Sequence, residues 1–81
     1  NRREFQALNL GDIQKLFETK KIKDSLDIGL MIKLGLIKKN ELVKILAKGE
    51  FSSKVDITAH KFSASAKEII TKNGGTVSEI E

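Results

Sequence analysis

His60 and Ser63 come closest to a catalytic pair by type and spacing. A serine nucleophile needs a positioned base, usually an imidazole that a third group orients. His60 is the only histidine and the chain has no cysteine, so one imidazole would have to supply all of this chemistry. We expect Ser63 to cap a helix instead, and the sequence predicts no enzyme.

Metal and nucleotide sites find no better support in the spacing of the polar residues. A zinc site needs about four clustered ligands, and one histidine with scattered carboxylates does not meet that count. Gly74-Gly75 follows a helical pattern instead of preceding one, and it lacks the lysine and hydroxyl of a phosphate-binding loop. We therefore predict no metal, no cofactor and no small-molecule substrate.

A basic elbow leads from a strand pattern into the last predicted helix. Either Ser63 or Ser65 fits the cap position, and Ser65 with Glu68 has the spacing of a capping box. Helix N-termini favour anions, and Lys61 and Lys67 flank this one. An ordinary capped surface helix with solvated lysines is the alternative interpretation. We define the basic elbow as His60, Lys61, Ser63, Ser65 and Lys67.

Two short strand patterns, residues 43–47 and 54–59, precede the elbow and are expected to pair around the turn-like 48–50. The helix after the elbow should end at Gly74-Gly75, before a terminal strand with Val77 and Ile80.

The front half of the chain predicts one strand and two helices. Phe5 to Leu10 alternates like a strand, and Asn9 fits the cap of a helix that begins near Leu10. Asp24 is the expected cap of the second helix, which Gly35 should end. The apolar stripes that should face the core are Ile13, Leu16 and Phe17 in the first helix, and Leu26, Leu30, Met31 and Leu34 in the second.

The phenylalanines are expected to pack and not to stack on bases. Phe5, Phe17 and Phe51 occupy apolar-face positions, and Phe62 precedes the cap, where it can staple the chain onto the helix. Tyr and Trp are absent, which argues against a stacking platform, with Phe62 its one candidate member.

Composition indicates a mild attraction to polyanions. The chain has 15 Lys and Arg against 11 Asp and Glu, a net charge of +4 and a pI of about 9.5. All of the basic residues except Arg2 and Arg3 are lysines, which suit phosphate contact better than base readout. No apolar run reaches the 18 residues of a membrane span, so no membrane partner is expected.

A longer pattern resembles the signature of the bacterial-type large-subunit ribosomal protein fifteen family. Two departures are Phe51, where the family usually has a smaller aliphatic residue, and Ser25, where proline is common. The resemblance spans nearly the whole chain, and neither departure touches a charged contact. The matching residues are Lys44-Ile45-Leu46-Ala47, Gly49, Phe62-Ser63, Ala66, Ile70 and Gly74, with Asn9-Leu10 and Gly35-Leu36-Ile37-Lys38 upstream.

The resemblance implies a fold, a domain organisation and a function. The fold would be an α/β class, small mixed domain built as an irregular stack of strand-strand-helix units. Residues 1–81 would be a single globular domain, the C-terminal half of a longer ribosomal protein whose basic, glycine-rich N-terminal extension is absent here. The protein would be a structural constituent of the large ribosomal subunit, in a cytoplasmic or organellar ribosome, with large-subunit ribosomal RNA and neighbouring ribosomal proteins as partners and a role in subunit assembly.

By the same resemblance, the basic elbow is the first candidate for contact with the RNA backbone. The weaker candidates are Arg2, Arg3, Lys38, Lys39 and Lys48. The alternative function is a protein-interaction module that docks an acidic partner without RNA.

Overall fold

The computed structural model describes residues 5–80, which form six strands and three helices. They are β1 (Phe5–Asn9), α1 (Leu10–Glu18), β2 (Ser25–Leu26), α2 (Ile28–Lys33), β3 (Leu42–Leu46), β4 (Asp56–Ala59), β5 (Lys61–Phe62), α3 (Ala64–Lys72) and β6 (Val77–Glu79). None of these helices is long and apolar enough to cross a membrane.

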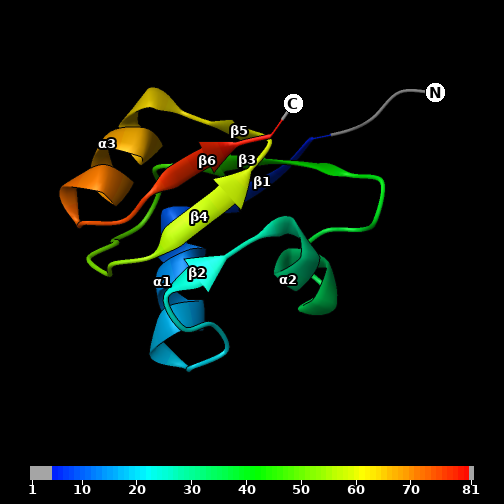
Figure 1. The fold of residues 1–81 in the computed structure, drawn as a ribbon, viewed down its shortest axis with the longest axis horizontal. Coiled ribbons are helices and arrows are strands. Elements are labelled where there is room, and N and C mark those ends of the chain that lie inside the picture. Colours follow the sequence, from blue (N-terminus) through cyan, green and yellow to red (C-terminus); the bar gives the residue numbers. More distant parts are fainter. Residues whose placement is uncertain (1–4, 81) are drawn as a thin grey trace.

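Successive strands alternate between two sheets (Figure 1). Sheet A has the order β1-β3-β5 and sheet B the order β2-β4-β6, and every pairing is parallel. Each turn of the chain therefore adds one strand to sheet A and one to sheet B, in the manner of a short, irregular superhelix. This arrangement confirms the small mixed α/β domain and the stack of strand and helix units.

The expected pairing of the two strand patterns around residues 48–50 is wrong. β3 lies in sheet A and β4 in sheet B, so the segment between them crosses from one sheet to the other. A glycine turn between two alternating patterns indicates a hairpin locally. Here β1 and β5 already occupy both edges of β3, and β4 has no free ladder position beside it.

The core lies between the sheets and is closed by the helices. Inward-facing strand residues alternate with exposed ones, because successive side chains of a strand point to opposite faces. Fully burying a Leu or Ile side chain contributes roughly 1.5–3 kcal/mol. The buried set includes Leu8, Val43, Ile45 and Phe62 of sheet A, Leu26, Ile57 and Ala59 of sheet B, and Leu10, Ile13, Met31, Ala66 and Ile70 of the helices.

The second helix begins later than the sequence predicts. Its cap is Asp27, whose carboxylate accepts a 2.8 Å hydrogen bond from the backbone N–H of Leu30, and not Asp24. Leu26, expected in the helix stripe, lies in β2 beside Ile57 and is fully buried there. Both aspartates are good cap residues, but only the later one leaves Leu26 free to join sheet B.

Gly75 holds the connection from α3 to β6 against the segment before β4. Its N–H donates to the carbonyl of Ile70 at 3.0 Å. A Cβ added at Gly75 would lie 2.1 Å from the carbonyl oxygen of Val55, inside contact distance of a backbone atom. Only glycine fits between these two backbones.

We expect Gly75→Ala to lower the free energy of unfolding by about 1–3 kcal/mol, because the backbone of Val55 or of the α3–β6 connection must shift. Gly29→Ala is the matched control, since its Cβ would meet only Asp27 Oδ1, at 3.6 Å. That change in α2 should stabilise slightly, by up to about 1 kcal/mol. Urea denaturation of both variants measures the difference, and equal stabilities would contradict the assigned contact.

Candidate nucleic-acid interface

Ser63 and His60 of the basic elbow make structural hydrogen bonds. Ser63 Oγ accepts from the backbone N–H of Ala66 at 3.2 Å, so Ser63 is the cap of α3, while Ser65 is an exposed residue inside the helix. His60 Nδ1 accepts from the N–H of Val43 at 3.0 Å, and the N–H of His60 donates to the carbonyl of Val43. The imidazole thus fastens the β4–β5 junction to β3.

The two lysines of the elbow diverge in space. Lys61 is exposed in β5, and its ammonium lies 5.9 Å from the centre of the Phe5 ring in β1. Lys67 is in α3, and its Nζ lies 3.4 Å from Glu79 Oε1 in β6, with both side chains nearly half exposed. The elbow is therefore not one cluster: one lysine belongs to sheet A and the other faces sheet B.

The remaining predicted contacts are scattered. Lys38 and Lys39 are exposed between α2 and β3, where the N–H of Lys38 donates to Glu41 Oε1 at 2.7 Å. Lys48 is exposed just after β3. Arg2 and Arg3 lie outside the described residues.

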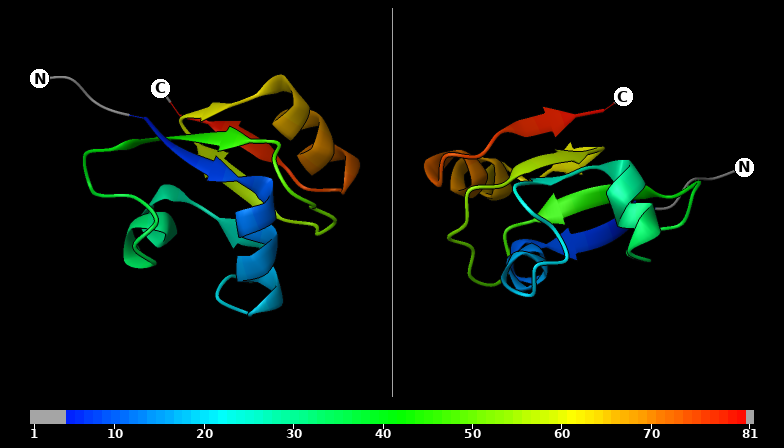
Figure 2. Two further views of the ribbon diagram at one scale, coloured as in Figure 1. Left: turned by 180° about the vertical axis from the view of Figure 1, so that it is seen from behind. Right: turned by 60° about the horizontal axis from the view of Figure 1, so that its bottom comes forward.

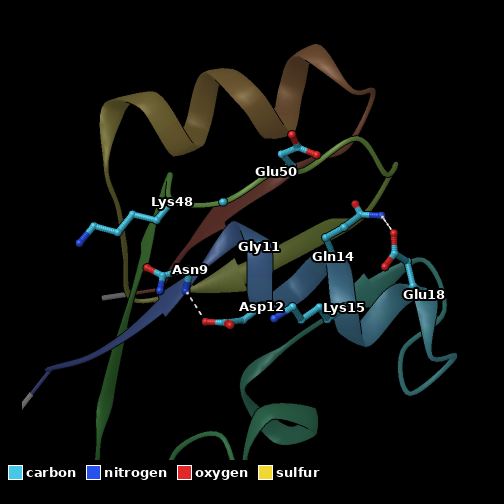
Figure 3. Close-up of a pocket in the computed structure, with 9 residues that line it drawn as sticks. Asn9, Gly11, Asp12, Gln14, Lys15, Glu18, Lys48 and Glu50 are labelled. Atoms are coloured by element: carbon cyan, nitrogen blue, oxygen red, sulfur yellow. Dashed lines mark hydrogen bonds between the residues drawn. The ribbon is translucent and has the colours of Figure 1, made fainter.

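Lys48 borders an open depression of about 360 Å³ between α1 and the segment after β3 (Figure 3). The backbone carbonyl of Lys48 accepts a 2.8 Å hydrogen bond from the N–H of Gly11. Gly49 has φ +82° and lies so near Gly11 that an added Cβ would be 2.8 Å from the Gly11 Cα. The two glycines let the loop touch the first turn of α1.

The polar groups of this depression are of mixed charge with an excess of carboxylates, and some of them already hydrogen-bond to one another. Three carboxylates, those of Asp12, Glu18 and Glu50, face two lysines, Lys15 and Lys48. The Gln14 side chain donates to Glu18 and accepts from Ser52 N and Ser53 Oγ. Such a lining does not favour an anion. Across residues 5–80, no three His, Asp or Glu side chains gather in a way that could hold a metal.

A surface that the sequence did not single out lies on the outward side of sheet A. Lys44 of β3 and Lys61 of β5 are register partners, and both are exposed. Adjacent strands are about 4.8 Å apart, and like charges on neighbouring strands repel each other. Alternation alone placed Lys44 toward solvent, but only the β3–β5 register brings it beside Lys61.

The prediction that three phenylalanines pack inward holds only for Phe51. Phe5 is 46% exposed and Phe17 is 36% exposed, whereas Phe51 and Phe62 are buried. Phe5 and the buried Leu8 lie on opposite faces of β1, because successive side chains of a strand alternate between the two faces. The aromatic rings that a ligand could reach are therefore Phe5 and, less exposed, Phe17, and not Phe62.

Residues 7–78 match the family model described as ribosomal proteins 50S-L15 and 50S-L18e together with their 60S counterpart. A protein of Christiangramia forsetii named large ribosomal subunit protein uL15 is 47% identical over 77 residues, which cover 95% of this chain and 51% of that relative. A protein of the same name from Mycobacterium ulcerans is 44% identical over 79 residues, covering 98% of this chain and 52% of the relative. The chain spans about half the length of the curated relatives it matches.

Ser63→Ala should lower the free energy of unfolding by about 1 kcal/mol, because the N–H of Ala66 loses its acceptor. Ser65→Ala is the control: Ser65 is exposed inside α3, where alanine is the better helix former. Thermal unfolding followed by circular dichroism separates the two variants. A larger loss of stability for Ser65→Ala than for Ser63→Ala would contradict the assignment of Ser63 as the cap.

Proposed function

Since the chain belongs to the family of ribosomal proteins 50S-L15 and 50S-L18e, we propose that it acts as a structural constituent of the large ribosomal subunit. The observation that carries this proposal is the family match over residues 7–78. The curated relatives are bacterial, so the proposed location is the cytoplasmic ribosome. That residues 1–81 form the C-terminal half of a longer protein stays a prediction.

The proposed partners are large-subunit ribosomal RNA and neighbouring ribosomal proteins. The exposed lysines support a polyanionic partner, because Lys67–Glu79 is the one ion pair formed within residues 5–80. A lysine without a carboxylate partner can neutralise a phosphate and release its counterion without first breaking an ion pair within the protein. Each phosphate neutralised adds about 0.7–0.9 to the salt slope of binding.

Among the candidate contacts, the structure supports some more than others. Lys61, Lys38, Lys39 and Lys48 are exposed and make no ion pair in the described part of the chain. Lys67 would first have to leave Glu79. A contact of His60 or Ser63 with RNA would have to leave their structural hydrogen bonds intact. Contacts by Ser65, Arg2 and Arg3 stay predictions.

We also propose that the protein is not an enzyme. A Ser63 nucleophile would need His60 as its base, but His60 Nδ1 is held by the N–H of Val43. Ser63 Oγ is itself held at the cap of α3. Both groups that could do chemistry stabilise the fold instead.

We expect the full-length protein to co-sediment with large ribosomal subunits in a sucrose gradient and to stay bound through a high-salt wash. Many simultaneous phosphate contacts, with protein neighbours around them, should make dissociation slow. Immunodetection across the gradient measures this. Recovery only at the top of the gradient would contradict the proposal and favour a module that docks an acidic protein away from the ribosome.

A further inference from the structure

Sheet A has an outward side that no part of the described chain covers. Figure 2 (left) shows this side, with β1 and β3 toward the reader and no helix lying across them. Inward-facing residues of the same strands, such as Val43 and Ile45, are fully buried. We call the outward side the open face and define it by the strand residues Phe5, Ala7, Asn9, Leu42, Lys44, Leu46 and Lys61.

The open face carries positive charge and no carboxylate. The register aligns Ala7, Lys44 and Lys61 in one row across the three strands. Neither lysine has a carboxylate partner among residues 5–80, so their repulsion is not relieved within the described fold. The outward side of sheet B differs: its strands carry Asp56, whose carboxylate accepts from the N–H of Thr76, and serine and threonine residues.

The open face also presents an aromatic ring beside the two ammonium groups. Phe5 begins β1 and leaves 46% of its surface exposed, although it is an apolar residue in a sheet. Lys61 reaches it from the opposite edge of the sheet, because β3 lies between β1 and β5. A cation within about 6 Å of a ring centre is attracted to the ring. The lysine side chain and the ring therefore lie across the same surface.

We propose that the open face binds an unpaired segment of RNA, with Lys44 and Lys61 on backbone phosphates and Phe5 stacked against a base. This inference rests on the proposed function for the class of its partner, and it adds a surface and a binding mode. Paired bases hide their faces within the helix, whereas unpaired bases can stack on an exposed aromatic side chain. Side-by-side ammonium groups without carboxylates match successive phosphates of one strand.

The test uses fluorescence anisotropy with labelled oligouridylate as the unpaired probe and a blunt RNA duplex as the paired one. Lys44→Gln with Lys61→Gln should weaken oligouridylate binding and lower its salt slope by about 1.4, which is two contacts at about 0.7 each. Lys33→Gln with Lys72→Gln removes the same charge from α2 and α3 and should change the slope by less than half as much.

Phe5→Leu keeps an apolar side chain but removes the ring, and it should weaken oligouridylate binding about fivefold or more, with a smaller effect on the duplex. Phe17→Leu, on α1 outside the open face, is its matched control and should bind as the parent does. Circular dichroism spectra confirm that each variant is folded before binding is compared.

Four outcomes would overturn the inference. One is an unchanged salt slope for the open-face lysine pair, and a second is no binding of oligouridylate by the parent chain. Another is equal loss for Phe5→Leu and Phe17→Leu. The last is that open-face variants of the full-length protein no longer co-sediment with large subunits but still bind oligouridylate. That result would assign the open face to a contact with a neighbouring protein. Failure of the proposed function is distinct, because the parent protein itself would then not co-sediment.

Discussion

The register of the parallel ladders is the constraint on which both the core and the surface depend. In sheet A, Leu8, Ile45 and Phe62 are aligned and buried, while Ala7, Lys44 and Lys61 are aligned and exposed. Side chains alternate with a period of two, so a slip by one residue would exchange these rows. Burying two lysines without partners would cost several kcal/mol each. The same pairing that builds the core therefore brings the two ammonium groups together.

Local patterns predicted most elements because they depend on a few neighbouring residues. The alternation in β4 and the serine cap of α3 are properties of the segments themselves. The partner of a strand is not such a property: β3 pairs with β1 and β5, which are separated from it by other elements. The expected hairpin failed for this reason, and Asp27 replaced Asp24 because Leu26 had to reach β4.

The candidate site shows the same limit at the level of single residues. Lys61 and Lys67 are close in sequence, but a strand and a helix turn them toward different sheets. Lys44 and Lys61 are far apart in sequence and adjacent in space. His60 was the one candidate for a catalytic base, but its side chain accepts a structural hydrogen bond from Val43 in β3. Sequence patterns predicted which lysines are exposed, whereas only the sheet order shows which of them lie side by side.

The interleaved strand order also governs how the chain can fold as it is synthesised. β1 has to wait for β3, and β2 for β4, because each ladder joins a strand to one that emerges much later. The last ladder forms only when Val77–Glu79 has been added beside β4. A growing chain thus keeps β1 unpaired until Leu46 has been added and β2 unpaired until Ala59 has been added, and unpaired edges are prone to aggregate. The length of each interval is set by the spacing of the paired strands, since synthesis adds about 5–20 residues each second.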